Sequence, residues 1–322
     1  MKKTVLLTGA SGFVGAALRV RLLADPRYKL KSAVRKVGLS PLEGEEIVQI
    51  AGLDADTDWT HALRHVDVVV HTAARVHVMN DTEHDPLAAF RSINVEGTLR
   101  LARQAVAAGV SRFVFVSSIK VNGEGTLPGM SYRPDDPPAP MDPYGVSKAE
   151  AEEGLMQLSA ESGLEVVIVR PVLVYGPGVK ANFLSMMRWL DRGVILPFGS
   201  IHNRRSLVAL ENLVDLLVVC CSHEAAAGQR FLVSDDEDLS TTMLLRRMAE
   251  ALDKSARLIP VPSSWLSGAA RLLGKKAISQ RLCGSLTVDI SKTRELLDWY
   301  PPASVDQALR STARHFKGHE SK

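Results

Sequence analysis

The stretch Val5-Leu-Leu-Thr-Gly-Ala-Ser-Gly-Phe-Val-Gly15 decides the fold, because a short apolar strand runs into a glycine-rich turn and then into a helix. In such a turn Gly9 permits the tight bend, Gly12 lets the backbone approach a pyrophosphate, and Gly15 lets the helix pack closely on the strand. The N-terminus of the helix supplies free N–H groups and a positive dipole to phosphates. The stretch therefore predicts a dinucleotide-binding site at the end of the first strand.

Apolar, β-branched runs alternate with helical patterns through the first half of the chain. Strands are expected at residues 5–7, 30–34, 66–71, 113–117 and 166–169, and helices at 14–23, 88–108 and from Tyr144 to about 162. This alternation is typical of a parallel sheet with helices on both faces. We therefore expect an α/β protein with a doubly wound Rossmann sheet and a smaller α/β region that caps the substrate.

The pattern breaks into shorter pieces from residue 174 onward, where Gly176-Pro-Gly178, Pro197-Phe-Gly199 and Pro260-Val-Pro262 mark turns. We expect the dinucleotide-binding domain at 1–173, with 206–221 returning to it as a strand or a buried helix. The substrate-binding region is expected at 174–205 and 222–316, followed by a disordered tail at 317–322.

Composition excludes several other classes of protein. The 322 residues are 46% hydrophobic, and 39 basic against 36 acidic residues give a net charge of +3, so we expect no nucleic-acid partner. No run reaches the roughly 18 apolar residues that span a bilayer, and the apolar N-terminal stretch is too short for a signal peptide. Cys220, Cys221 and Cys283 lack the spacing of metal ligands or of a disulfide framework. We expect a cytoplasmic protein with reduced cysteines and no metal.

Three residues downstream of the glycine-rich turn suggest catalysis. Tyr144 and Lys148 lie four residues apart in a predicted helix and so share a face. An ammonium group beside a phenol lowers the phenol's pKa and holds it ready for proton transfer. The Tyr144/Lys148 pair therefore predicts a hydride-transfer site, with Ser118 on the strand that lies between the glycine-rich turn and this pair.

With these motifs the chain resembles the extended short-chain dehydrogenase/reductases, especially the branch of nucleotide-sugar epimerases, dehydratases and 4-ketoreductases. The resemblance covers nearly the whole chain, and it implies a homodimer that pairs helices around 88–108 and 144–162. Smaller motifs in the same order add to it: His71-Thr-Ala-Ala74, Asn94-Val-Glu-Gly-Thr98, Arg170-Pro171, Tyr175-Gly-Pro177, Asp289-Ile-Ser-Lys292 and Leu297-Asp-Trp-Tyr-Pro301.

The resemblance implies that Tyr144 is the acid/base at the sugar C4 oxygen, that Ser118 hydrogen-bonds this oxygen, and that Lys148 binds the nicotinamide ribose. Alignment on Val121-Asn-Gly123, which matches a V-Y-G pattern, selects Ser118 over Ser117, although Asn122 replaces the tyrosine of that pattern. The implied cofactor contacts are Gly9, Ser11, Gly12, Phe13, Val14, Gly15, Arg35, Leu53, Ala73, Tyr144, Lys148 and Pro171.

Arg35 bears on the choice of cofactor. It follows the second strand, where the family often has an acidic residue that binds the ribose 2′-hydroxyl. A guanidinium at this position can instead bind a 2′-phosphate, so NADP(H) is favoured and NAD(H) is the alternative. The other interpretation of Arg35 is a solvated basic turn. Asp54 stands two positions beyond the adenine-contacting aspartate of the family, so it has no assigned role.

The resemblance also implies a UDP-sugar as the substrate. Asn182 and Arg205 are expected at its diphosphate, where a guanidinium suits two phosphate oxygens. Pro197 lies in a loop resembling one that stacks on the nucleotide base, and Arg281 is expected to close the site. The 4,6-dehydratases of the family place an Asp-Glu pair where this chain has Ile119-Lys120. Dehydration is therefore not expected.

The leading hypothesis from the sequence is an NAD(P)H-dependent reductase of the 4-keto group of a UDP-linked 6-deoxy, N-acetylamino hexose, acting in surface-polysaccharide synthesis. The alternative is an NAD-dependent 4-epimerase of a UDP-hexose or UDP-N-acetylhexosamine, which would use the same three catalytic residues. A reductase of a small carbonyl compound without a nucleotide fits the first domain, but Asn182 and Arg205 argue against it. A non-catalytic dinucleotide-sensing protein is a minor alternative, since such proteins commonly lose the tyrosine or the lysine.

Overall fold

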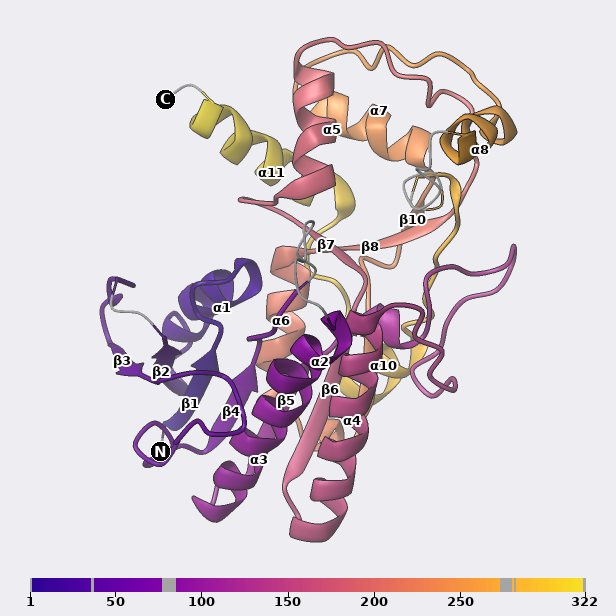
Figure 1. The fold of residues 1–322 in the computed structure, drawn as a ribbon. Coiled ribbons are helices and arrows are strands. Elements are labelled where there is room, and N and C mark those ends of the chain that lie inside the picture. Colours follow the sequence, from indigo (N-terminus) through magenta and orange to yellow (C-terminus); the bar gives the residue numbers. More distant parts are fainter. Residues whose placement is uncertain (1, 36–37, 77–84, 273–279, 281, 321–322) are drawn as a thin grey trace.

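A large parallel sheet forms the base of the molecule in the computed structural model, which describes residues 2–35, 38–76, 85–272, 280 and 282–320 (Figure 1). Its strand order is β3-β2-β1-β4-β5-β6-β9, and every neighbouring pair is parallel. The order reverses between β1 and β4, where Leu7 is in register with Val70, and ligands bind at such switch points. The strands are β1 (Lys3–Thr8), β2 (Tyr28–Val34), β3 (Glu45–Gln49), β4 (Val68–His71), β5 (Arg112–Val116), β6 (Glu165–Pro171) and β9 (Arg230–Val233).

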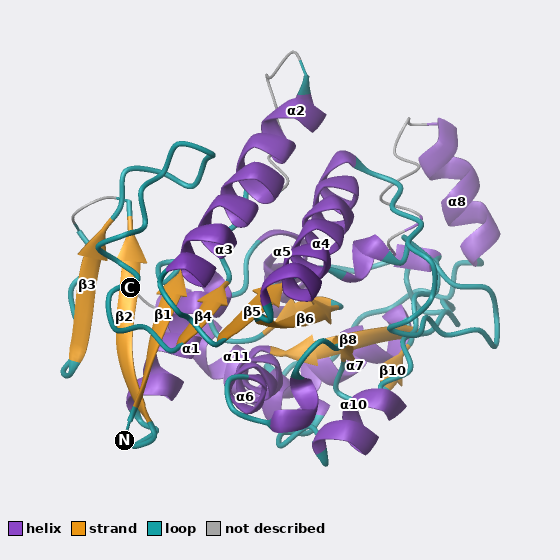
Figure 2. Cartoon of the chain, turned by 90° about the horizontal axis from the view of Figure 1, so that it is seen from below, coloured by secondary structure: helices purple, strands orange, loops and turns teal. Residues whose placement is uncertain are grey.

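Helices cover both faces of this sheet (Figure 2). Side chains alternate along β1, so Val5 and Leu7 join one buried cluster while Leu6 joins another. The first cluster includes residues of α1 (Phe13–Leu23) and α6 (Leu210–Cys220), and the second includes residues of α3 (Thr98–Ala107) and α4 (Pro143–Ser162). The apolar runs of the sequence are therefore buried on both sides, as in doubly wound sheets. The predicted Rossmann fold is confirmed.

The helix predicted at 88–108 consists of three consecutive pieces. These are α2 (Pro86–Arg91), the π-helical turn η1 (Ser92–Gly97) and α3. A Cβ on Gly97 would lie 1.9 Å from the carbonyl oxygen of Leu53, so only glycine allows the loop after β3 to approach this turn. The π-helical turn thus lies against a loop that borders the dinucleotide side of the sheet, and such turns occur often at functional sites.

A smaller α/β region lies above the carboxyl ends of the large sheet (Figure 1). It contains a three-stranded sheet in the order β10-β8-β7 and its own buried cluster of apolar residues. Its strands are β7 (Leu173–Tyr175), β8 (Arg205–Ala209) and β10 (Asp238–Leu239), and its helices are α5 (Ala181–Asp191), α7 (Thr241–Ala251), α8 (Ser263–Leu272) and α11 (Val305–Glu320). The other elements are α10 (Ser291–Leu297) and the 3₁₀ turns η2 (Ile119–Val121) and η3 (Glu224–Ala226).

Three segments differ in detail from their expected places. Residues 206–221 divide between the two regions, because β8 joins the small sheet whereas α6 packs on the large one. Residues 222–316 were expected in the substrate-binding region, but β9 within this range pairs with β6 of the large sheet. The tail expected to be disordered continues α11 as far as Glu320, and Lys317 forms an ion pair with Asp253 at 2.8 Å. Across the described ranges, no helix is long and apolar enough to cross a membrane.

Candidate active site

The glycine-rich turn between β1 and α1 leaves room for a ligand only because side chains are missing from it. Gly9 has a φ of +74°, and a Cβ there would lie 2.7 Å from the backbone nitrogen of Ala73. A Cβ on Gly15 would lie 2.1 Å from the carbonyl oxygen of Gly9. No side chain caps α1 at Gly12, so the first N–H groups of the helix remain available to phosphate oxygens. The turn fits the pyrophosphate of a dinucleotide.

The other predicted cofactor residues follow the carboxyl ends of neighbouring strands. Ala73 comes after β4 and is buried, Leu53 comes after β3 and packs beside Gly97, and Pro171 ends β6. Ser11 is exposed in the glycine-rich turn, and Phe13 and Val14 are half-buried at the start of α1. Arg35 follows β2 and is exposed. These positions border one edge of the sheet, where a bound dinucleotide would lie.

Helix α4 presents Tyr144 and Lys148 in its first two turns. Asp142 caps the helix by accepting a hydrogen bond from the Gly145 N–H at 2.7 Å, and Pro143 occupies the first helical position. The ammonium of Lys148 donates to the carbonyl oxygen of Val116 at 2.8 Å and lies 4.2 Å from the centre of the Phe115 ring. Lys148 is fully buried, and this burial lowers its pKa to about 7, although the Glu152 carboxylate acts in the opposite direction.

The pKa of Tyr144 differs from the sequence-based expectation. Lys148 was expected to lower it, whereas burial and the nearby Asp142 carboxylate raise the pKa of this phenol well above its ordinary value. The physical reason is that the Lys148 ammonium is directed at the Val116 carbonyl group at the end of β5. Tyr144 therefore keeps its proton at neutral pH in the protein alone.

Two adjacent serines at the end of β5 have different surroundings. Ser117 is buried and donates a 2.5 Å hydrogen bond to Glu152. Ser118 is half-exposed and accepts a hydrogen bond from the Lys120 N–H at 3.2 Å. The hydroxyl of Ser118 has no hydrogen-bond acceptor among the described residues, so it can donate to a ligand. The structure thus leaves the predicted Ser118, and not Ser117, open to substrate.

Polar side chains behind the predicted catalytic residues hold the elements together. Asn94 forms hydrogen bonds with the backbone of Arg75 and with the Ser147 hydroxyl on α4. Its motif was quoted from the sequence, but no role was predicted for it. His71 lies between the hydroxyl groups of Thr8 and Thr98, and burial lowers its pKa to about 3, so it is neutral. The contacts of Asn94 link the π-helical turn to α4, and the contact of His71 with Thr98 links β4 to α3.

Asn122 replaces the tyrosine of the related pattern and has a definite structural place. Its side-chain oxygen accepts a hydrogen bond from Arg170, and its amide donates to the carbonyl oxygen of Arg133. Asn122 is buried, so it supports the loop that follows Ser118 from behind.

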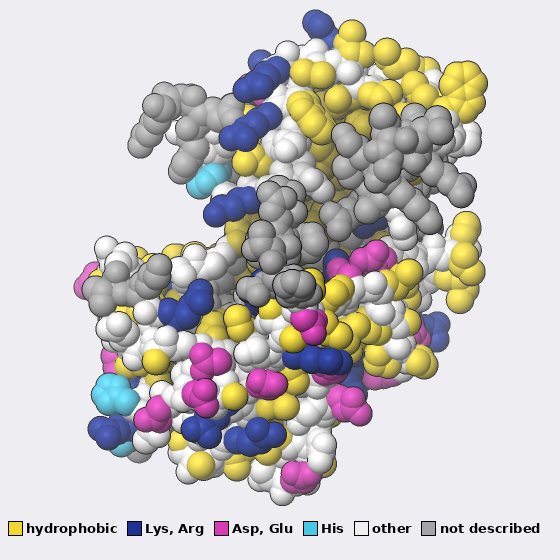
Figure 3. Space-filling model, viewed as in Figure 1, with side chains coloured by type: hydrophobic (Ala, Val, Ile, Leu, Met, Phe, Trp, Pro, Cys, Tyr) yellow, Lys and Arg dark blue, Asp and Glu magenta, His cyan; other side chains and the backbone are white. Residues whose placement is uncertain are grey.

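A cleft of about 1170 Å³ separates the glycine-rich turn from the smaller region. Residues Ser11 to Phe13 line it from the large sheet, while Gly176 and Lys180 before α5 and His315 of α11 line it from above. The surface in Figure 3 is hollowed between the two regions on its left side. The cleft borders the glycine-rich turn, and its lining contains none of Ser118, Tyr144 and Lys148.

The predicted substrate residues lie in the smaller region at separate elements. Asn182 is exposed in the first turn of α5, and Pro197 is half-buried in the loop after that helix. Arg205 begins β8 and donates to the carbonyl oxygen of Gly284 at 3.1 Å. Arg281 lies outside the described residues, but Leu286 of the following segment forms an isolated bridge with Arg205. The structure thus brings Arg205 beside the C-terminal segment expected to close the site.

The fold and the site together define an enzyme of the extended short-chain dehydrogenase/reductase class. The chain belongs to the NAD dependent epimerase/dehydratase family, whose sequence profile matches residues 5–234. A Vibrio cholerae protein described as UDP-glucose 4-epimerase is 49% identical over 317 residues, covering 98% of this chain and 96% of that protein.

Solved structures agree with the fold. A UDP-glucuronic acid 4-epimerase from Bacillus cereus in complex with NAD superposes with a TM-score of 0.77 at 19% identity, covering 98% and 99% of the two chains. A UDP-glucose 4-epimerase from Thermotoga maritima with UDP-glucose has a TM-score of 0.75 at 20% identity, covering 98% of this chain and 99% of that one.

Proposed function

We propose that the protein is an NAD-dependent 4-epimerase of a UDP-linked hexose. The observation that carries this proposal is that Tyr144 and Lys148 share the first two turns of α4, and that Lys148 donates to the end of β5, where Ser118 follows. The 49% identity to a protein described as UDP-glucose 4-epimerase supports the same reaction. From the sequence, a 4-ketoreductase was the leading hypothesis and this epimerase the alternative, and the relatives support the epimerase better than the reductase.

In the proposed site the C4 oxygen of the sugar lies between the hydroxyl groups of Ser118 and Tyr144. A bound nicotinamide dinucleotide supplies hydride acceptance and hydride return at C4. Tyr144, once ionised, would take the C4 hydroxyl proton in the oxidation half and return it in the reduction half, while Ser118 holds the oxygen. The ammonium of Lys148 stabilises the phenolate form of Tyr144 when it arises. Lys148 is buried and Tyr144 is half-buried, which limits the access of water to the reacting atoms.

A net 4-ketoreductase is the second candidate, and Arg35 is the residue that favours it. The guanidinium is exposed where β2 ends and offers a partner for a 2′-phosphate, so it suits an exchangeable NADPH. The raised pKa of Tyr144 suits the reduction of a ketone, which begins with a protonated phenol, whereas the oxidation half of the epimerase begins with the phenolate. Ile119-Lys120 offers no carboxylate pair, which argues against a 4,6-dehydratase.

We also propose places for the substrate and for a second subunit. Asn182 and Arg205 would bind the diphosphate of the UDP group, Pro197 would lie against its base, and Arg281 would close the site. The predicted homodimer would pair the helices α3 and α4 of two subunits, since both lie on the outer side of the same face of the sheet (Figure 2). Sedimentation of the purified protein tests this assembly.

The nucleotide content of the freshly purified protein separates the two candidate reactions. Denatured protein is assayed for NAD(H) and NADP(H), and stripped protein is then titrated with each. Near-stoichiometric NAD supports the epimerase, because such an enzyme returns hydride to the same substrate without exchanging its cofactor. An empty protein that prefers NADPH, and that loses the preference in Arg35→Asp, supports the reductase and overturns the epimerase.

A further inference from the structure

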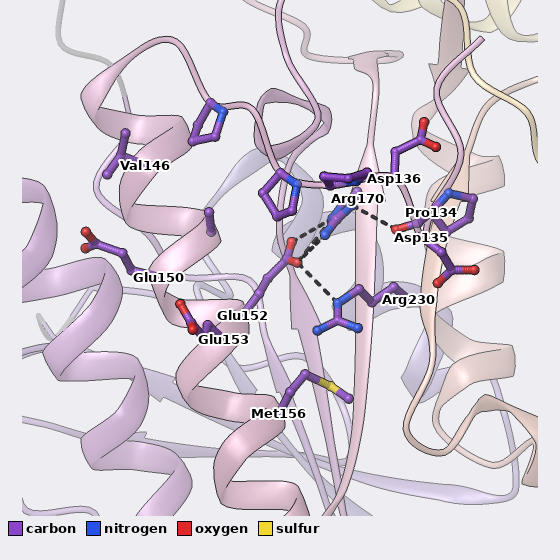
Figure 4. Close-up of a pocket in the computed structure, with 14 residues that line it drawn as sticks. Pro134, Asp135, Asp136, Val146, Glu150, Glu152, Glu153, Met156, Arg170 and Arg230 are labelled. Carbon is purple, nitrogen blue, oxygen red and sulfur yellow. Dashed lines mark hydrogen bonds and ion pairs between the residues drawn. The ribbon is translucent and has the colours of Figure 1, made fainter.

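A buried carboxylate, Glu152, lies behind the catalytic residues. It follows Lys148 by one turn of α4 and Tyr144 by two, so all three lie along the same side of the helix. Its side chain is 3% exposed and pairs with the equally buried Arg170, whose terminal nitrogen lies 2.6 Å from the carboxylate and whose Nε lies 2.9 Å from it (Figure 4). The paired guanidinium of Arg170 compensates the charge of this buried carboxylate.

The same carboxylate holds the end of β5. Ser117 donates to it at 2.5 Å, and Ser117 directly precedes the catalytic Ser118. Arg170 in turn donates to the side chain of Asn122 and to the carbonyl oxygen of Pro134. Glu152 therefore connects α4, which carries Tyr144 and Lys148, with the strand end that carries Ser118 and with β6.

The charged and polar groups around Lys148 show why a carboxylate is needed there. From β5 the ammonium contacts the Val116 carbonyl group and the Phe115 ring, and from β4 it faces the neutral His71. Tyr144 lies one turn before it on α4. Among the described residues, Glu152 is the negative charge that acts on Lys148, and it opposes the loss of the proton that burial favours.

We propose that Glu152 is a positioning residue of the catalytic site: its carboxylate, fixed by Arg170 and Ser117 one helical turn from Lys148, favours the charged form of Lys148 and aligns Ser118 with Tyr144. The alignment of Ser118 with Tyr144 rests on the function proposed above, whereas the charge on Lys148 is measurable without any sugar substrate.

Arg230 of β9 gives a second way to change this charge. Its Nε lies 3.7 Å from Glu152, and its side chain is 33% exposed in a pocket of about 660 Å³ that opens behind α4 (Figure 4). Met156 and Pro134 also line this pocket. Arg230 partly offsets the charge of Glu152, and because solvent reaches it, its replacement disturbs the packing far less than replacement of Arg170.

The test measures NAD affinity by calorimetry and kcat, each between pH 5.5 and 9. Lys148 binds the ribose as an ammonium, so both quantities fall as pH rises through the pKa of Lys148. In Glu152→Gln the buried Arg170 loses its counter-charge and the pKa of Lys148 falls, so the midpoint of this loss moves down by about one pH unit. In Arg230→Gln the midpoint moves up by about 0.3 unit, because a partly exposed pair is screened.

Two further variants separate charge from structure. Ser117→Ala removes a hydrogen bond and keeps the charge, so its midpoint stays within about 0.2 unit of the wild type. Glu152→Asp keeps the charge and moves the midpoint back toward the wild-type value. An unchanged midpoint in Glu152→Gln, with affinity and kcat reduced equally at every pH, overturns the proposal.

If Glu152→Gln does not fold, Arg230→Gln tests the proposal by itself. The proposal is then overturned if the pH midpoint of the loss of NAD affinity in Arg230→Gln stays at the wild-type value or moves down. Failure of the protein to turn over any UDP-sugar counts against the proposed function alone, because the NAD titration needs no sugar.

Discussion

Replacement of Gly15 by alanine tests whether the glycine-rich turn is built for a dinucleotide. The added Cβ would lie 2.1 Å from the carbonyl oxygen and 2.7 Å from the carbonyl carbon of Gly9, both backbone atoms that cannot rotate away. Ordinary contact begins at 3.4 Å, so α1 and the turn must move apart by more than about 1 Å. Overpacking of this kind costs about 1–3 kcal/mol.

Two matched variants make the assay specific. A Cβ on Gly12 meets only the carbonyl oxygen of Gly9, at 3.1 Å, while a Cβ on Gly318 of α11 has no described atom within 4 Å. We expect Gly15→Ala to lower both the melting temperature, by several degrees, and NAD affinity. Gly12→Ala should keep its melting temperature but lose at least about tenfold in affinity, which is about 1.4 kcal/mol. Gly318→Ala should change neither.

Thermal unfolding and calorimetric titration with NAD measure these effects. Wild-type affinity in Gly12→Ala would refute the reasoning, because the backbone at that position would then not approach the pyrophosphate. Wild-type stability in Gly15→Ala would show that α1 can move from the turn without cost.

The remaining predictions concern single side chains. Tyr144→Phe should lower kcat by about 10²–10⁴-fold and leave NAD affinity within about threefold. Steady-state kinetics and calorimetry measure the two effects, and retained turnover would contradict the prediction. Tyr175→Phe removes the 2.8 Å hydrogen bond that the Tyr175 hydroxyl donates to the buried Asp235. This should lower the free energy of unfolding, measured by urea titration, by about 1–2 kcal/mol, and no change would mean that this hydrogen bond adds nothing to stability. Arg35→Asp should weaken NADPH binding more than NADH binding, and an equal effect on both would assign Arg35 to a solvated turn.

Local patterns predicted the elements that carry the site. The strand-turn-helix around Gly9 and the helix that starts at Tyr144 depend on residues close together in sequence, and both appear as expected, with α4 ending at Ser162. Ser118 could be chosen over Ser117 because the neighbouring Val121-Asn-Gly123 matched a family pattern. The structure adds that Ser117 is occupied by Glu152.

Long-range contacts explain what the sequence could not reveal. The four residues of β9 become a strand only through pairing with β6, about sixty residues earlier. The role of Glu152 depends on Arg170, Arg230 and Ser117, which come from three different strands or strand ends. Burial also determined the pKa of Tyr144, and the spacing between Tyr144 and Lys148 does not report burial.

Conversion of UDP-glucose in deuterated water, followed by proton NMR, tests the central claim most directly. A 4-epimerase that returns the same hydride to C4 should give UDP-galactose without deuterium at C4 and without net consumption of NADH. Absence of conversion by NAD-loaded protein, or deuterium at C4 of the product, would contradict the account.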